Sequence, residues 1–344
     1  MASSDLPPGV GYFLNQLSGL LLAPGSHFSL SSLGCALVIA VGFVAWQRHR
    51  RGRPVRLRAI LRALFPRRIL ASPSNFADLG YLFFNLFLYG LLFGWTAISY
   101  QFLTNGIMGA LAASFGQTAP TTLPGFVERA VITVMLFLAY ELGYWLNHYL
   151  SHRVPFLWEF HRVHHTATVL TPVTNFRVHP VYTFVFVNIL AISTAIANGA
   201  GNYMFGETAY QYALSDTNII LVIFIHTYVH LQHTELWMPL SGALGRVFMS
   251  PAHHQLHHST NPAHFNKNMG SCLALWDWMF GTLYVPGKEP EKLSFGVDPD
   301  DQSVHTITGA YLDPFVRAAG VVRNALPKQT PRMAAIAGEQ RNEA

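Results

Sequence analysis

Histidines grouped in three short clusters are the residues of this chain whose types and spacing point most directly to chemistry. The first cluster contains H-x-x-x-H and then H-x-x-H-H, the second is H-x-x-x-H, and the third is H-x-x-H-H. Residues three and four apart share one face of a helix, so each H-x-x-H-H is expected to direct three imidazoles toward one spot. Imidazole is a common ligand of zinc, iron, copper and nickel. The clusters predict these metal ligands: His148, His152, His161, His164, His165, His226, His230, His254, His257 and His258.

The number of clustered histidines favours a pair of metal ions. Two ions of five or six coordination need about ten ligands, counting water or oxygen. A closed structural zinc site is tetrahedral and uses far fewer. Soluble diiron bundles use glutamates and Glu-x-x-His, and no Glu-x-x-His occurs in this sequence. The pattern therefore indicates a histidine-rich, open site.

The elements that position these histidines are expected to lie in a membrane. Charged residues make up 11% of the 344 residues and hydrophobic residues 51%, whereas ordinary globular chains are about 25% charged. A spanning helix needs about 20 mostly apolar residues. We expect an all-α polytopic membrane protein with four to five transmembrane helices, drawn from the segments 28–46, 79–100, 127–147, 181–198 and 212–229.

An arginine-rich segment predicts the orientation of these spans. Residues 47–76 hold nine arginines, whereas residues 104–126, expected to form a loop, hold no charged residue. The positive-inside rule places 47–76 in the cytoplasm. Counting spans from there puts all three histidine clusters on the cytoplasmic side, in a helical cap, at the bacterial inner membrane or the endoplasmic reticulum. We find no recognition motif for nucleic acid and expect none to bind.

Three regions are expected along the chain. Residues 1–27 form an N-terminal segment whose short apolar part can lie in the membrane interface, and 28–290 form the membrane-embedded domain with the clusters. Residues 291–344 form a polar tail, expected to be disordered beyond about 325. The first 47 residues contain no Lys or Arg, so no cleavable signal peptide is expected. The two cysteines are far apart and predict no disulfide.

The clusters and their flanking residues resemble one known family. The matching motifs are N-H-Y-L-S-H-R (147–153), L-W-E-F-H-R-V-H-H (157–165), F-I-H-T-Y-V-H (224–230), S-P-A-H-H-Q-L-H-H-S (250–259) and N-K-N-M-G with L-W-D-W-M-F-G-T-L-Y (266–284). Over roughly residues 127–300 the chain resembles the fatty acid hydroxylase/sterol desaturase superfamily of integral-membrane diiron oxygenases.

The resemblance implies a core of eight histidine ligands, with further ligands at two more positions. The core is His148, His152, His161, His164, His165, His254, His257 and His258. His226 and His230 stand where some members supply further ligands. The candidates to support the ligands from behind are His179, His233, Asn268 and Asp277. His230 is left open as either a ligand or a support.

The resemblance also implies a reaction. Two ferrous ions would bind and reduce O2, and hydrogen would be removed from an unactivated C–H bond of a membrane lipid. Return of a hydroxyl gives an alcohol and loss of a second hydrogen gives an alkene; hydroxylation is favoured. The substrate can be a fatty acyl chain, a sterol or a polar lipid. No flavin, haem or nicotinamide motif is evident, so electrons are expected from a separate cytochrome b5-like or ferredoxin-like protein.

A different class of function also fits histidine clusters at the ends of apolar helices. A membrane metal transporter or sensor would use cytoplasmic histidines as well. Transport calls for polar ligands inside the spans, and these segments hold few. A non-catalytic scaffold is a third reading, and the oligomeric state is left open. A dinuclear iron centre that reacts with O2 would support the oxygenase, whereas metal flux in vesicles would support the transporter.

Overall fold

The computed structural model describes residues 8–26, 28–90, 97–297 and 302–325, and these are mostly helical. The helical fold class is therefore confirmed. Strands are limited, in the described residues, to the short antiparallel pair β1 (Ala213–Leu214) and β2 (Thr217–Asn218), joined through Ser215 and Asp216 in left-handed conformation.

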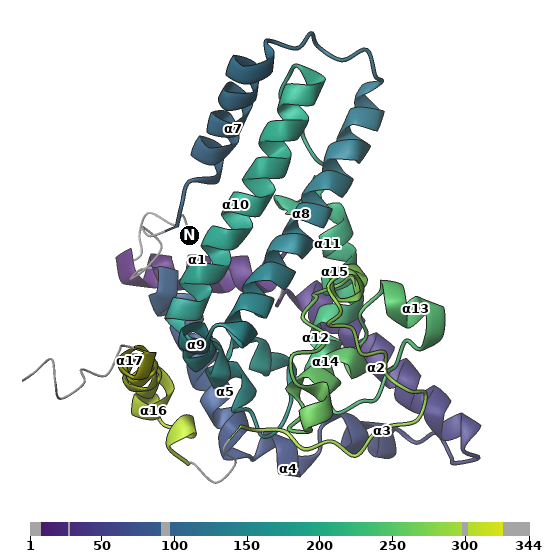
Figure 1. Cartoon of the computed structure of the whole chain (residues 1–344). Helices are drawn as coiled ribbons and strands as arrows, with labels where there is room; N and C mark the ends of the chain where they lie inside the picture. The colour runs from purple at the N-terminus through teal and green to yellow at the C-terminus, as the bar shows by residue number, and fades with distance from the viewer. Residues whose placement is uncertain (1–7, 27, 91–96, 298–301, 326–344) are drawn as a thin grey trace, which may run out of the picture.

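Three long helices form a bundle that extends away from the rest of the molecule (Figure 1): α7 (Tyr100–Phe115), α8 (Gly125–Arg153) and α10 (Pro180–Phe205). Their backbones approach closely at glycines. A Cβ on Gly143 of α8 would lie 2.3 Å from Ser193 Oγ of α10. Small residues at such crossings are typical of helices packed in membranes.

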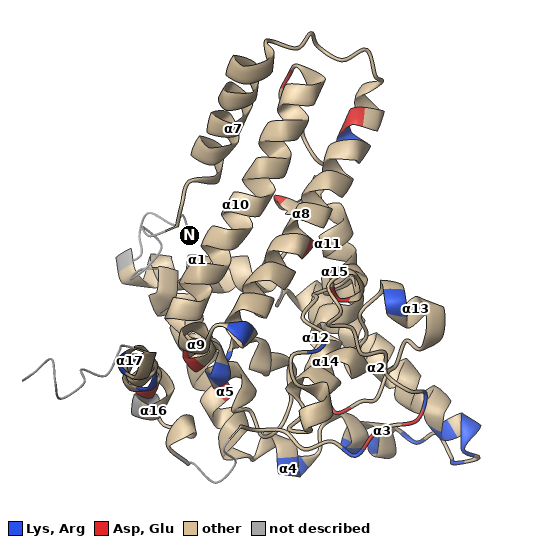
Figure 2. Ribbon diagram, viewed as in Figure 1, with Lys and Arg blue, Asp and Glu red and all other residues tan. Residues whose placement is uncertain are grey.

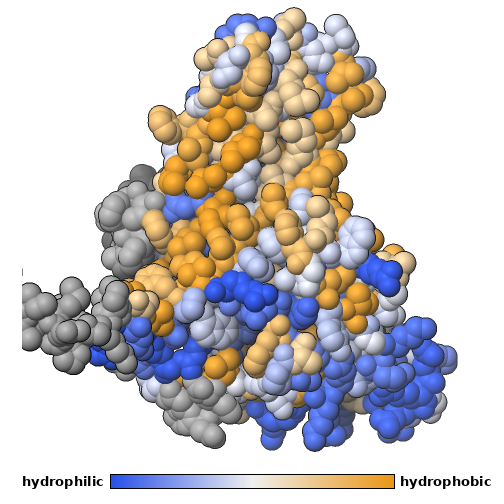
Figure 3. All heavy atoms as spheres, in the orientation of Figure 1, coloured by the Kyte–Doolittle hydropathy of each residue, from blue (hydrophilic) through white to orange (hydrophobic). Residues whose placement is uncertain are grey.

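Within the described residues, two helices are long and apolar enough to cross a bilayer, α2 (Leu30–Arg50) and α10. Together with the hydrophobic surface of the bundle in Figure 3, they indicate a membrane protein. The count of four to five spans stays a prediction. α8 is long but carries Glu128, Arg129 and Glu141. The expected span 212–229 begins with the hairpin of β1 and β2 and continues as α11 (Ile219–Phe224) and the π-helix η5 (Ile225–Val229).

Two other segments differ from expectation. The expected span 79–100 contains the end of α5 (Pro73–Phe83) and the π-helix η2 (Phe84–Tyr89), and its residues 91–96 lie outside the described residues. The expected loop 104–126 is helical in its first half, where α7 packs along α10. Ser99 caps α7 by accepting a hydrogen bond from the Phe102 amide.

The remaining helices form a cap at one end of the bundle. Lys and Arg gather there, where α2 meets α3 and α4 (Figure 2), and the surface is hydrophilic (Figure 3). The elements not yet named are α1 (Pro8–Leu22), α3 (Leu57–Leu64), α4 (Arg67–Leu70), α9 (Pro155–His165), η4 (Pro172–Phe176), α12 (His230–Gln232), α13 (Gly242–Val247), α14 (Pro251–His258), η6 (Pro262–His264), α15 (Leu275–Met279), η7 (Gln302–His305), α16 (Ile307–Tyr311) and α17 (Asp313–Ala325).

Part of the expected polar tail is folded. α17 packs on α9, with the Phe315 ring centroid 5.2 Å from that of Phe160 and 5.2 Å from that of His179. The helix is amphipathic, and Pro314 and Ala318, four residues apart on one face, are buried. Residues 326–344, where disorder is expected, lie outside the described residues.

A buried ion pair connects three segments of the cap. Arg177 Nη1 lies 2.8 Å from Asp78 Oδ1, and both side chains are fully buried. Arg177 also donates to the Val163 carbonyl and to the Thr166 hydroxyl near the end of α9. The pair therefore connects α5, α9 and the segment after η4.

Replacing Arg177 with methionine is expected to destabilise the protein by about 3–5 kcal/mol, because Asp78 would remain buried without its partner. Chemical unfolding followed by tryptophan fluorescence measures the change. The exposed pair of Arg68 and Glu235 is the control, and Arg68→Met should cost less than about 1 kcal/mol. Equal effects of the two substitutions would show that the buried ion pair stabilises the protein no more than the exposed pair does.

Candidate metal centre

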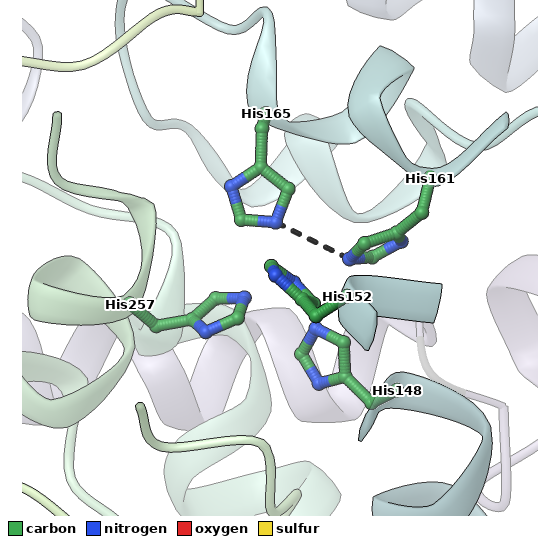
Figure 4. Close-up of side chains that lie close together, drawn as sticks. All are labelled: His148, His152, His161, His165 and His257. Atoms are coloured by element: carbon green, nitrogen blue, oxygen red, sulfur yellow. Dashed lines mark hydrogen bonds between the residues drawn. The ribbon is translucent and has the colours of Figure 1, made fainter. Parts of the chain in front are cut away.

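Five histidines from three helices converge on one point (Figure 4): His148 and His152 of α8, His161 and His165 of α9, and His257 of α14. One nitrogen from each ring lies within 4.8 Å of the corresponding atoms of the others. α8 and α9 meet at an elbow where Val154 is extended before Pro155, the first residue of α9. The elbow turns α9 back so that its histidines face those of α8.

Four further histidines form a second group beside the first: His164 of α9, His233 just after α12, and His254 and His258 of α14. The Nε2 atom of His233 lies 2.8 Å from that of His254 and 3.2 Å from those of His164 and His258. The two groups touch, because the rings of His165 and His258 stack with centroids 4.6 Å apart.

Each H-x-x-H-H motif divides its histidines between the two groups. The i and i+4 residues of α9 join the five-histidine group, whereas His164 between them turns to the four-histidine group. In α14 the i and i+4 residues join the four-histidine group and His257 turns to the other. The expectation that three imidazoles of one motif meet at a single spot was therefore wrong, because the i+3 and i+4 residues lie about 100° apart around the helix axis.

The nitrogen atoms are arranged as metal ligands would be. Two nitrogens bound to one metal at about 2.1 Å lie about 3.0–3.4 Å apart, and the Nε2 contacts of the four-histidine group are 2.8–3.2 Å. In the five-histidine group the buried Nε2 atoms of His148, His152 and His257 have no hydrogen-bond partner among the described residues. A buried polar atom without a partner is costly, so both groups fit a bound metal ion.

The rings are neutral and keep a free lone pair for a metal. Burial is the main cause that lowers the pKa of His164 to about 3 and that of His257 to about 4. Burial and the neighbouring imidazoles hold the pKa of His165, His254 and His258 well below the usual range. Metal binding to imidazole needs this unprotonated form.

This burial predicts how the metal-free protein responds to acid. An unfolded histidine has a pKa near 6.5, so the unfolded chain takes up protons before the folded site does. The free energy of unfolding should therefore decrease as the pH falls below about 6.5 and keep decreasing to at least about 3, the pKa of His164 in the folded protein. Denaturant unfolding of metal-free protein at a series of pH values measures it. Constant stability across this range would mean that the rings are not buried as described.

A loop after η6 presents backbone carbonyls to the back of two rings. His148 Nδ1 donates to the Met269 carbonyl and His257 Nδ1 to the Lys267 carbonyl, both at 2.8 Å. These hydrogen bonds fix the tautomer, so that Nε2 faces the group. Asn266 and Asn268 adopt left-handed conformations (φ 57° and 60°), which turn the loop so that its carbonyls reach the rings.

Asp277 and Asn268 hold this loop and do not touch a histidine ring of the two groups. Asp277, fully buried, accepts from the Met269 and Gly270 amides at 2.8 and 2.7 Å, and also from Trp145 and Thr282. Asn268 donates to the His253 and Tyr284 carbonyls. Both were predicted to support the ligands from behind, and in the structure they contact backbone groups and not the rings.

Three other histidines predicted at the site lie away from both groups. His226 contacts Ser31 Oγ at 3.1 Å and His230 contacts Ser32 Oγ at 2.9 Å, both on α2. His179 caps α10 by accepting from the Val181 amide, and contacts the Tyr311 carbonyl. His233, predicted only as a support, lies inside the four-histidine group. Which of these histidines bind metal stays a prediction.

The backbone of Arg177 is a support that the sequence did not suggest. His164 Nδ1 lies 3.3 Å from the Arg177 carbonyl, whose position the buried ion pair with Asp78 fixes. The signal available in the sequence was that Arg177 is the one Lys, Arg, Asp or Glu between Arg162 and Glu207.

A cavity of about 590 Å³ reaches both groups from the surface. His152, His165 and His257 of one group and His258 of the other form its inner wall. Pro155, Trp158, Phe265 and Val297 line it with apolar surface, and Arg153 and Thr260 are exposed residues at its rim. The Trp158 ring centroid lies 5.1 Å from that of His152. The cavity therefore connects exposed rim residues with histidines of both groups.

Fold and site together define a class: helical membrane proteins with two adjacent groups of imidazoles at the ends of long helices. Comparison with known families agrees, because residues 133–282 match the family described as Fatty acid hydroxylase. This match confirms the resemblance to the fatty acid hydroxylase/sterol desaturase superfamily. The matched segment contains all nine grouped histidines.

Individual relatives are lipid oxygenases. The chain is 30% identical over 166 residues to alkylglycerol monooxygenase of Danio rerio. The aligned segment covers 47% of this chain and 32% of that protein. The chain is 28% identical over 164 residues to the Homo sapiens protein of the same name, again with 47% and 32% covered. It is 24% identical over 215 residues to ornithine lipid hydroxylase OlsE of Rhizobium tropici, which covers 58% of this chain and 60% of that protein.

The matched segments thus span about a third of the first two relatives. No significant match is found among solved structures.

Proposed function

We propose that the protein is an O2-dependent hydroxylase of a membrane lipid that uses two iron ions. The observation that carries the proposal is the pair of adjacent groups of buried imidazoles, five and four in number, inside the segment that matches the Fatty acid hydroxylase family. Two iron ions would supply the binding and reduction of O2 and the oxidising power to break an unactivated C–H bond.

Residues of the protein would position the metal ligands, keep them unprotonated and exclude water. The α8–α9 elbow and α14 hold the rings in place, and the loop carbonyls of Lys267 and Met269 fix their orientation. Burial keeps the rings unprotonated at neutral pH. Apolar walls keep bulk water from the inner end of the cavity, where the bond to be oxidised would lie.

The substrate is proposed to be a lipid whose chain enters the cavity beside Trp158. Its inner end touches histidines of both groups, and apolar residues line the walls. Relatives named for alkylglycerol and ornithine lipid act on lipids with polar head groups, which supports a polar-headed substrate. The rim residues Arg153 and Thr260 would then face the head group. Hydroxylation is favoured over desaturation because these relatives are a monooxygenase and a hydroxylase.

The orientation follows from the arginines of residues 47–76, which gather at the cap end of the molecule (Figure 2). The positive-inside rule would place this end, with both histidine groups, in the cytoplasm. A cytochrome b5-like or ferredoxin-like donor would dock there, and the basic surface would attract an acidic carrier.

Incubation of the full chain with Fe(II), a reducing system, membrane lipids and 18O2 tests the proposal. We expect one lipid class to gain one labelled oxygen, and His257→Ala to lose this product. His49→Ala, an exposed residue of α2 outside both groups, should keep it. An unlabelled lipid profile together with metal flux in vesicles would instead support the transporter alternative.

A further inference from the structure

A groove of about 990 Å³ lies along the cap end of α2, between this helix, η5 and the segments 237–241 and 288–290. None of the nine grouped histidines lines it. It is therefore a separate feature from the cavity beside Trp158, and the proposed oxidation does not use it.

The walls of the groove change from apolar to basic along α2. Ile39, Phe43 and Trp46 follow one another at helical spacing on the face of α2 that lines it. Tyr228 and Leu231 line the opposite wall. At the end of α2 the lining becomes charged, with Arg50, Arg51 and Lys288 beside a single acid, Glu289.

This gradient follows the direction in which α2 leaves the membrane. α2 is one of the two helices apolar enough to span a bilayer, and Ile39 lies near its middle while Arg50 is its last residue. With α2 across the bilayer, the apolar part of the groove would lie at the depth of the acyl chains and the basic part at the depth of the phosphates. Basic pockets at this level between helices bind the head groups of anionic lipids.

We propose that this groove binds an anionic phospholipid of the adjoining leaflet, with its acyl chain along Phe43 and Trp46 and its phosphate against Arg50, Arg51 and Lys288. The three cations outnumber the single carboxylate, which gives the charge complementarity for a phosphate. A neutral apolar ligand would leave the basic end unused, and a soluble protein partner would not reach residues at the depth of Ile39.

The bound lipid would lie against segments that carry the metal centre. Ser250 and Pro251, which begin α14, line the groove, and so does Leu231, two residues before His233. A lipid in the groove would therefore pack against the starts of the segments that hold His233 and His254. The proposal depends on α2 lying in the membrane and not on the reaction at the histidines.

Tryptophan quenching by brominated lipids tests the site. The full chain in detergent is titrated with phosphatidylglycerol or phosphatidylcholine carrying the same brominated acyl chains. Trp46 and Trp237 line the groove and report occupation. We expect phosphatidylglycerol to quench at a concentration at least about tenfold lower, since each basic residue near a membrane contributes about 1 kcal/mol toward an anionic lipid.

Matched variants assign the preference to the groove. Arg50→Gln with Arg51→Gln should remove the preference for phosphatidylglycerol, and Glu289→Gln should strengthen it. Arg56→Gln with Arg58→Gln changes the same basic segment outside the groove and should leave the preference in place. Trp46→Phe with Trp237→Phe should remove most of the quenching.

Three results would overturn the proposal. Equal quenching by the two lipids would mean that no anionic head group is recognised. An equal loss in both arginine pairs would assign the effect to general attraction by the basic segment. Quenching that persists without Trp46 and Trp237 would place the lipid elsewhere.

Discussion

Replacing His233 with alanine is expected to lower the bound iron from two ions per chain to about one and the rate of lipid oxidation by more than about 100-fold. His233 Nε2 contacts the Nε2 atoms of three other histidines, so it lies at the middle of the four-histidine group. Loss of its ring removes a ligand and opens the group to water. Elemental analysis and product formation measure the two effects.

His226→Ala is the matched control. Its ring contacts Ser31 and the Val222 carbonyl and lies outside both groups. Iron content and activity should stay near those of the unsubstituted protein. If His226→Ala removes iron and His233→Ala does not, the assignment of His233 as a ligand is overturned in favour of the motif formed by His226 and His230.

Replacing Asp277 with alanine is expected to lower the apparent melting temperature by about 10 °C or more, and iron binding with it. Four donors, from Met269, Gly270, Trp145 and Thr282, would lose their acceptor in a fully buried place. Each buried unsatisfied group costs about 1–3 kcal/mol, so four groups cost about 4–12 kcal/mol, and about 7 kcal/mol corresponds to that shift in a chain of 344 residues. The Met269 carbonyl that orients His148 would also be displaced.

Thr282→Val removes one of these hydrogen bonds and keeps the carboxylate. We expect a loss of about 1 kcal/mol and unchanged iron content. A similar effect of the two substitutions would show that the loop does not depend on the charge of Asp277. Thermal unfolding of iron-free and iron-loaded protein separates the stability effect from the effect on metal binding.

Much of the site could be predicted because its signals are local. The spacing of histidines on α8, α9 and α14 identified eight of the nine grouped histidines, although it did not show how each H-x-x-H-H divides between the two groups. Ser250 and Pro251 predict the start of α14 in the same way, through a cap and a proline at the first helical position. Such rules need no knowledge of distant contacts.

The exchange of His233 for His230 could not be predicted from spacing. In a regular α-helix His226, His230 and His233 would share a face. The π-helix η5 inserts an extra residue per turn before His230, which rotates that ring toward Ser32 of α2. The helix then ends at Gln232, and His233 leaves it with non-helical backbone angles (φ −97°, ψ 67°), so that its ring reaches the four-histidine group. Nothing in the local sequence marks such a π-turn.

Other differences have their origin in tertiary contacts. The uncharged stretch before residue 116 is helical because α7 finds a partner in α10. The polar tail folds as far as Ala325 because α17 finds one in α9. In both cases packing decides the structure of a segment whose own preference is weak.

Anomalous X-ray diffraction at the iron edge, from crystals of iron-loaded protein, tests most directly whether two ions share nine histidines. We predict two peaks, one within bonding distance of His148, His152, His161, His165 and His257, and one within bonding distance of His164, His233, His254 and His258. A single peak, or a peak beside His226 and His230, would contradict this arrangement.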